Sequence, residues 1–368
     1  MANNRIFYAC QAVAIAPCPD SNNFTELHGV QSVGINTSFN LEQIFELGQI
    51  SIYENIEGLP DVELTIEKVL DGYPLAYRLS TQNVNGSNPG DKLVERTKNR
   101  CSAVLAIYPD DKDIVSGTPQ QQVYMSGMYV NAISYTLPVE GNCTESVTLV
   151  GNHKQWNLSN KFTSSLAFPK FATSGNVDVP KNLQSGYVAG GVQRRENVVM
   201  ASSIVPTAVL NSYGLSATAT TGNNWDSSAK APKAHIQNIS ISTDLGREDI
   251  LELGQRAPYY RAPNFPVEVT AEFEVISISG DFVYAYENGN PAYVGTINEG
   301  SNTSEETIKI RLTDGTTFDL GSKNRLSSVT YGGGDAGGGN ASMTFSYVTY
   351  NDLDVIPPHG GAGELANV

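Results

Sequence analysis

Residues 236–275 read IQNISISTDLGREDILELGQRAPYYRAPNFPVEVTAEFEV, and most of this stretch occurs twice in the chain. Residues 30–60 read VQSVGINTSFNLEQIFELGQISIYENIEGLP and align with residues 236–266 at a constant offset of 206 without a gap. Eleven of the 31 columns are identical, whereas average composition gives about two by chance. A repeat of this length predicts two related structural units in one chain.

The similarity extends beyond the gap-free block. When one residue is dropped from the first copy, Val62–Thr65 aligns with Val267–Thr270. Further along, residues 142–149 (NCTESVTL) are similar to residues 340–346 (NASMTFS). We therefore expect the same order of elements in both halves.

Alternation of apolar and polar residues indicates strands. Residues 267–275 alternate in this way, and Asp314-Gly315 between two alternating runs is a hairpin signal. Between strands, Thr243 or Asp244 is suited to cap a helix of about ten residues that ends at Gly254, and Thr37 or Ser38 with Gly48 repeats the pattern. The predicted fold class is all-β with one short helix per repeat.

Length and composition fit two domains. The chain has 368 residues, 40% hydrophobic and 17% charged, with 34 glycines and 18 prolines. We expect one domain over residues 1–151, a linker or extended arm over 152–195, and a second domain over 196–368.

Charge and hydropathy exclude several classes. The net charge is −15, with −6 before residue 190 and −9 after it, so neither half resembles a basic module that reads duplex DNA. No apolar run approaches the ~18 residues of a membrane helix, and the N-terminus does not resemble a signal peptide. The four cysteines are expected to be reduced, although Cys10 and Cys18 could pair.

Catalytic and metal-binding patterns are not found in the sequence. It has no G-x-S-x-G, and its four histidines lack the i, i+4 spacing of a helical zinc site. The glycine run at 332–339 leads into a strand rather than a helix, which argues against a phosphate loop. Glu272 and Glu274 lie two apart and are interpreted as the wet face of a strand rather than as a hydrolase pair. We expect no enzyme activity, no cofactor and no metal.

The second copy resembles the tail tube proteins of tailed bacteriophages. The resemblance rests on residues 242–277, STDLGREDILELGQRAPYYRAPNFPVEVTAEFEVIS, with residues 192–198 before them. It covers about 45 residues, and the first copy only through the repeat, since that copy lacks the Pro-Tyr-Tyr-Arg loop. The resemblance implies tail-tube-like β-barrel or sandwich domains that form stacked rings and a hollow tube conducting DNA to the host.

The resemblance also implies partners and a location. Two copies per chain suggest a trimer with a pseudo-sixfold ring, and six chains with one domain of each outside is the alternative. The partners would be the chain itself, other tail proteins such as the terminator, tip or baseplate and sheath, and viral DNA in transit without specific binding, with no membrane. The location would be the virion tail, after synthesis in the host bacterial cytoplasm.

Two sets of residues follow as candidates. The wet-face acids are candidates to line the lumen, where they would repel phosphate: Glu63, Glu67, Glu268, Glu272 and Glu274. The shared motif is a candidate interface: Glu46, Leu47, Gly48, Gln49, Glu252, Leu253, Gly254, Gln255, Tyr259 and Arg261. The glycine-rich run and the 152–195 arm are candidates for ring-to-ring contact.

A second hypothesis is a tandem β-sandwich that binds carbohydrate or a receptor on a tail fibre or as a capsid decoration. It predicts exposed aromatic residues beside acids, and monomers or compact trimers rather than tubes. A third, a carboxylate-pair hydrolase, requires two acids that converge from different strands.

Overall fold

The computed structural model describes residues 6–18, 24–83, 92–110, 119–158, 191–199, 205–213, 235–280, 283, 305–334 and 339–357. In these ranges the protein is all-β with a few short helices, so the predicted fold class is confirmed. The helical segments are α1 (Ala76–Ser80), α2 (Leu93–Arg96), α3 (Thr207–Asn211) and the 3-10 turns η1 (Tyr8–Cys10) and η2 (Arg195–Asn197). None of these helices has the length and apolar character needed to span a membrane.

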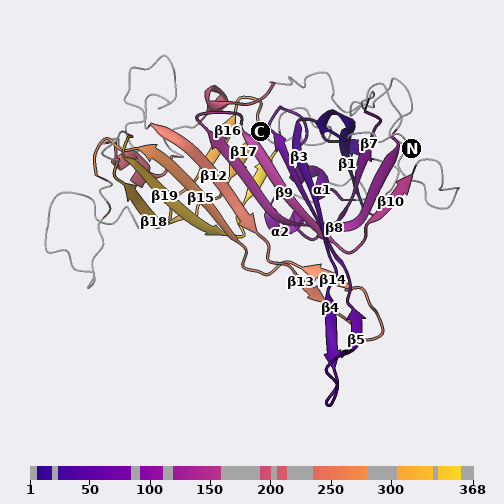
Figure 1. The fold of residues 1–368 in the computed structure, drawn as a ribbon. Helices are drawn as coiled ribbons and strands as arrows, with labels where there is room; N and C mark the ends of the chain where they lie inside the picture. The colour runs from indigo at the N-terminus through magenta and orange to yellow at the C-terminus, as the bar shows by residue number, and fades with distance from the viewer. Residues whose placement is uncertain are drawn as a thin grey trace.

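One continuous antiparallel sheet runs through both halves of the chain (Figure 1). The first half contributes, in spatial order, β3 (Val30–Ser38), β6 (Asp61–Val69), β9 (Thr144–Gly151) and β8 (Gln121–Pro138). The second half contributes β12 (Ile236–Asp244), β15 (Glu268–Ile276), β19 (Ser342–Tyr350) and β18 (Arg325–Gly332). The halves meet where β8 pairs with β12, so the last strand of one set of four adjoins the first strand of the next.

The internal repeat appears in the pairing as well as in the order. β3 has an irregularity at Gln31 against β6, and β12 has one at Gln237 against β15, which are equivalent positions at the offset of 206. A bulge adds a residue to one strand and fixes its register. The two halves are therefore related copies of one four-stranded arrangement.

Register corrects the expected alignment after the gap-free block. Ser32 lies opposite Glu67, while its equivalent Asn238 lies opposite Glu274. The second copy therefore has one residue more than the first at this point, whereas the expected alignment gave it one residue fewer, and Glu67 corresponds to Glu274. Sliding a strand by two residues leaves every side chain on its original face, so alternation alone does not distinguish the two alignments.

A second layer packs over one face of these eight strands; in the first half it continues the same hydrogen-bonded sheet, and in the second half it is a separate four-stranded sheet. The long strand β8 leaves the main sheet at its N-terminal end and pairs there with β7 (Cys101–Ile107) and β10 (Gln155–Leu158). This layer continues through β1 (Gln11–Pro17) to β2 (Thr25–Glu26). In the second half, the layer consists of β11 (Val198–Val199), β16 (Lys309–Leu312), β17 (Thr317–Asp319) and β20 (Asp354–Ile356), with the predicted Asp314-Gly315 turn between β16 and β17.

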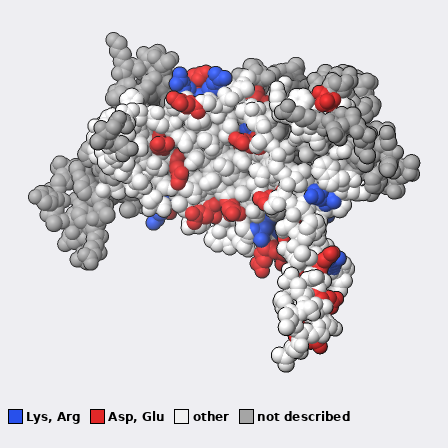
Figure 2. All heavy atoms as spheres, in the orientation of Figure 1, with Lys and Arg blue, Asp and Glu red and all other residues white. Residues whose placement is uncertain are grey.

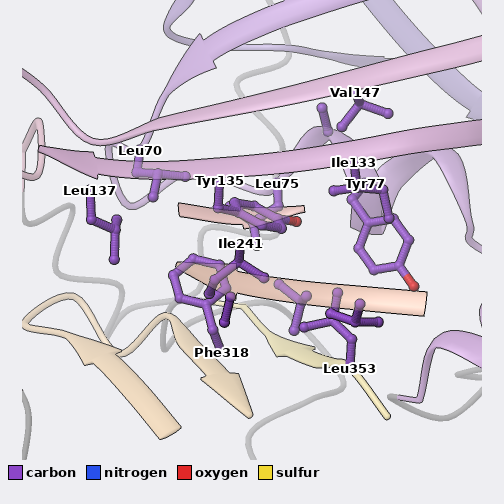
Figure 3. Packing of buried hydrophobic residues seen from close by; sticks show 14 of the residues in the cluster. Leu70, Leu75, Tyr77, Ile133, Tyr135, Leu137, Val147, Ile241, Phe318 and Leu353 are labelled. Carbon is purple, nitrogen blue, oxygen red and sulfur yellow. The ribbon is translucent and has the colours of Figure 1, made fainter. Parts of the chain in front are cut away.

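A single hydrophobic core extends across the two halves. Tyr135 of β8 packs on Phe318 of β17 with ring centroids 4.6 Å apart, and Figure 3 shows Ile241 of β12 between the same layers. The Tyr135 hydroxyl donates to the buried Glu145 carboxylate at 3.0 Å, and Glu145 accepts the backbone N–H groups of Ala76 and Tyr77 at the start of α1. Tyr135 and Glu145 thus have hydrogen-bond partners within the core, as burial of a polar group requires.

The helix expected in each copy is wrong, because a β-hairpin takes its place. β4 (Leu41–Phe45) pairs with β5 (Ile52–Glu57), and β13 (Glu248–Ile250) pairs with β14 (Tyr260–Ala262). Gly48 and Gly254 have φ of 94° and 87°, a region that favours glycine both at a helix end and in a hairpin turn, so the glycine signal did not distinguish them. Strands β4, β5 and β13 are also exposed along nearly their whole length, whereas an amphipathic helix needs a face buried against the core.

Candidate assembly surfaces

One face of the main sheet is open and lined by short polar side chains. Strand alternation puts most valines, leucines and isoleucines on the core side and leaves mainly serine and threonine outside. A row of cross-strand partners illustrates this, running Val348, Thr270, Ser242, Ser134, Ser146, Glu67 and Ser32. We call this surface the polar face.

The five acids predicted from strand alternation all lie on the polar face. Glu63 and Glu67 are on β6, and Glu268, Glu272 and Glu274 are on β15, and each lies between two buried neighbours in the sequence. Serine hydroxyl groups donate to two of them, from Ser32 to Glu67 at 3.2 Å and from Ser240 to Glu272 at 3.3 Å. Whether the face surrounds a lumen is a separate question, addressed below.

Positive charge is sparse on the polar face within the described strands. Lys68 of β6 points to the other side, is fully buried and lies 3.3 Å from Asp71. Arg325 stands at the end of β18 beside Glu305, at 3.6 Å. In Figure 2 the body is mostly uncharged, with scattered carboxylates on it and along the projecting β4–β5 hairpin.

The polar face is hollowed where the two halves join. The depression is lined by residues of β8, β9, β12 and β15, among them Ser134, Thr148, Ser242, Asp244 and Glu268.

The shared Glu-Leu-Gly-Gln motif forms the tips of the two hairpins. The β4–β5 hairpin projects well beyond the body, and β13–β14 lies near its base (Figure 1). Leu47, Ile50 and Leu253 are completely exposed at these tips, and Tyr259 is 75% exposed. Exposed apolar side chains grouped on a projection are typical of a surface that another protein covers.

Arginines of the second copy clamp the bases of the hairpins together. The Arg261 guanidinium lies 2.7 Å from Asp61 at the start of β6 and 2.9 Å from Asp249 of its own hairpin. Arg256 donates to the backbone oxygens of Glu57 and Gly58 at 2.8 and 3.1 Å. Burial opposes ionisation of Asp61, but hydrogen bonds from Asn40 and Arg261 outweigh it and lower the pKa of this carboxyl below its ordinary value.

Arg247 extends the clamp into the first half. Its guanidinium donates to the backbone oxygens of Val130 at 2.6 Å and Thr97 at 2.5 Å, and lies 4.8 Å from the centre of the Tyr129 ring. Burial lowers the pKa of Arg247 to about 10, so the side chain remains cationic at neutral pH. Of these three arginines the sequence indicated only Arg261. Arg247 and Arg256 donate to backbone oxygens, and Asp61, which pairs with Arg261, is distant in sequence, so no local motif marks these contacts.

The main sheet ends in two strands that have one neighbour each among the described residues. β3 pairs with β6 alone, and β18 pairs with β19 alone. Such edges present unpaired N–H and C=O groups that can bind another strand. The edges belong to opposite ends of the repeat, since β3 corresponds to β12, the first strand of its set, and β18 corresponds to β8, the last strand of its set.

Other features singled out in the sequence are placed as follows. Glu272 and Glu274 belong to one strand, β15. Within the described ranges, no three His, Cys, Asp or Glu side chains are placed to hold a metal ion, and the cysteines are unpaired. Residues 159–190 of the predicted arm and 335–338 of the glycine-rich run lie outside the described residues.

Comparison with known proteins finds limited similarity. No family model matches the chain, and no curated protein matches it. A chain of the anti-feeding prophage baseplate is 11% identical with a TM-score of 0.32, covering 44% of this chain and 99% of that one. A chain of the anti-feeding prophage tube-terminating cap is 10% identical with a TM-score of 0.31, covering 43% and 94%. A chain of the sheath–tube complex of an extracellular contractile injection system is 12% identical with a TM-score of 0.29, covering 43% and 94%. Values of this size identify no family for the chain.

Proposed function

We propose that this chain is a structural subunit of a phage tail tube, in which copies join edge to edge into rings and the rings stack into a hollow tube for DNA. The single observation that carries the proposal is the β8–β12 junction. Inside one chain, the last strand of the first set of four already pairs with the first strand of the second set. Repeating that step joins β18 of one chain to β3 of the next.

Head-to-tail joining of this kind closes into a ring or continues as an open helix, and curvature determines which. The hollow on the polar face lies on the side around which the sheet would close. Three chains would supply 24 strands, and at about 4.8 Å between strands these give an untilted circle about 37 Å across, which strand tilt widens. The trimer with six repeats therefore leaves an open channel.

The polar face is the proposed wall of this channel. Carboxylates facing inward would repel phosphate, so that DNA passes without the salt-dependent attachment that a basic wall produces. Glu67 and Glu274 hold equivalent positions in the two copies and would lie at the same height around the axis. Their hydroxyl and carboxylate neighbours leave the channel hydrophilic along its length.

The hairpins are the proposed contact between rings. The β4–β5 hairpin projects past the end of the sheet strands rather than from either face, so it would extend along the axis of such a ring, with β13–β14 at its base (Figure 1). Their apolar tips would be covered by the neighbouring ring. This role needs no chemical step, in keeping with the expectation that the chain is not an enzyme, and places the protein in the virion tail.

Negative-stain electron microscopy of the purified chain across concentration and salt tests the proposal, with ring mass measured in parallel. We expect rings or tubes with a mass of three chains per ring. Tyr331→Lys, on the β18 edge, should abolish them, whereas Tyr8→Lys, at a residue that is also exposed but lies outside both edges, should not. Small particles in every condition, including after addition of tail-tip components, would contradict the proposal and favour the binding-module hypothesis.

A further inference from the structure

β8 and β18 are equivalent strands at residue level. β8 has a bulge against β9 between Val130 and Ala132, and β18 has one against β19 between Leu326 and Ser328. Superposing the bulges relates each residue of β8 to the one 196 positions later. This places Tyr135 on Tyr331, so the same side chain occupies the same core-facing position in both copies.

The edge that would dock on β18 is equivalent to β12. β3 and β12 share the offset of 206, and the hairpins that follow them pair identically at that offset. For example, Glu42 lies opposite Ile56 in the first hairpin, and the equivalent residues of the second hairpin, Glu248 and Ala262, also lie opposite each other. The internal junction therefore shows which residues meet when one repeat docks on the next.

On the basis of the proposed function, we propose that a second copy of this chain docks its β3 on β18 in the register of the internal junction. Inside the chain Ile241 lies opposite Tyr135 and Ser242 opposite Ser134. The equivalent pairs between chains are Ile35 opposite Tyr331 and Asn36 opposite Thr330.

Incomplete burial at both edges supports this register. Tyr331 is 56% exposed although its cross-strand partner Met343 is fully buried, and Val329 and Ile35 are only partly covered. Tyr135, the equivalent of Tyr331, is fully buried under β12 and β17. Docking β3 in this register covers Tyr331 as β12 covers Tyr135, and burial of apolar area favours it.

The junction between chains would differ chemically from the one inside the chain. Position 55, equivalent to Arg261, is asparagine, and Asp61 corresponds to Glu268, so an amide–carboxylate hydrogen bond replaces the ion pair. The first copy has Leu41 and Ile50 at the positions equivalent to Arg247 and Arg256. The arginine contacts are therefore confined to the junction inside the chain. Rings would therefore separate between chains before the two halves of one chain separate.

Cysteine cross-linking tests the register. Chains with Asn36→Cys and chains with Thr330→Cys are mixed in equal amounts and oxidised, and the inference expects a disulfide-linked dimer on a non-reducing gel. Asn36→Cys mixed with Ser328→Cys is the matched control, since the second thiol lies on the same face but two residues away, beyond the reach of a disulfide. Ser134→Cys with Ser242→Cys in one chain is the positive control, and the unsubstituted chain gives the background from the native thiols.

The outcomes separate the register from the function. Cross-linking of Asn36→Cys with Thr330→Cys, well above the Ser328→Cys control, supports the inference. If rings or tubes form but Asn36→Cys cross-links better to Ser328→Cys than to Thr330→Cys, or to neither, the register is overturned. The proposed function then still holds. Absence of both cross-links together with absence of rings, while the positive control forms, overturns both.

Discussion

Arg261 of β14 and Asp61 of β6 join the two copies at the base of the hairpins, with Nη2 2.7 Å from Oδ1. The arginine side chain is 9% exposed and the aspartate side chain 47% exposed, so water screens the pair only in part. This partly screened ion pair holds the β13–β14 hairpin of the second copy against the start of β6 in the first copy.

Replacement of Arg261 by alanine is expected to destabilise the chain by about 1–3 kcal/mol, because Asp61 and Asp249 lose a charged donor. Urea unfolding of Arg261→Ala, Asp61→Asn and the double variant gives the coupling energy, expected at about 0.5–3 kcal/mol. Lys309→Ala is the control, since its pair with Asp319 is more exposed and should cost about 0–1 kcal/mol. Additive single effects would show that the pair does not couple the copies.

Phe318→Ala is expected to cost about 3–5 kcal/mol, because it opens a cavity against Tyr135 in the core that both halves share. Thermal unfolding should remain a single transition if the halves unfold together. Phe39→Ala removes the same ring from a side chain that is 69% exposed and should change stability little. Two separate transitions in the wild-type chain would contradict the shared core.

Glu26 should make stability depend on pH, because burial raises the pKa of its carboxyl from 4.5 to about 7. The folded chain then holds this proton more tightly than the unfolded chain, so its contribution is greatest below pH 4.5 and is lost as pH rises through 7. Glu26→Gln should remove this loss and gain stability relative to wild type at pH 8. The measurement is the melting temperature of wild type and Glu26→Gln from pH 4.5 to 8, with Glu42→Gln, at an exposed residue, as control. A difference between wild type and Glu26→Gln that stays constant across this range would refute the prediction.

Leu47→Ser combined with Ile50→Ser should leave the melting temperature nearly unchanged, since both side chains are completely exposed, but should shorten or abolish tubes while rings persist. Ile278→Ser, at an exposed residue away from the hairpins, is the control. Tube length distributions in the electron microscope measure the effect. Tubes of normal length would exclude the hairpin tips from ring-to-ring contact.

Glu67→Lys with Glu274→Lys should make assembled tubes retain short DNA in a salt-dependent manner, because equivalent positions of both copies would turn a repulsive wall into an attractive one. Glu42→Lys with Glu248→Lys, on the hairpins, adds the same charge elsewhere. DNA co-sedimentation with tubes at rising salt distinguishes them. Equal retention by both variants would place the polar face away from the channel.

The repeat was predictable because its residues lie in one gap-free block, and the strand at 267–275 because alternation marks a half-buried sheet. The hairpins were not predictable as hairpins. Gly48 and Gly254 suit both a helix end and a turn, and only the lack of a core surface beneath these segments rules out the helix. The expected alignment of β15 with β6 was wrong, because a shift of two residues leaves the same side chains facing outward.

By itself the sequence determined that the protein is a duplicated all-β chain with acidic strand faces, since period-two alternation and the recurrence of a 31-residue block are local properties. Only the tertiary structure decided how the copies meet. The pairing of β8 with β12 and the contact of Arg261 with Asp61 bring together residues 100 or more positions apart, and the same topology leaves β3 and β18 as open edges. Such contacts depend on register and on the packing of whole layers, which no single segment encodes.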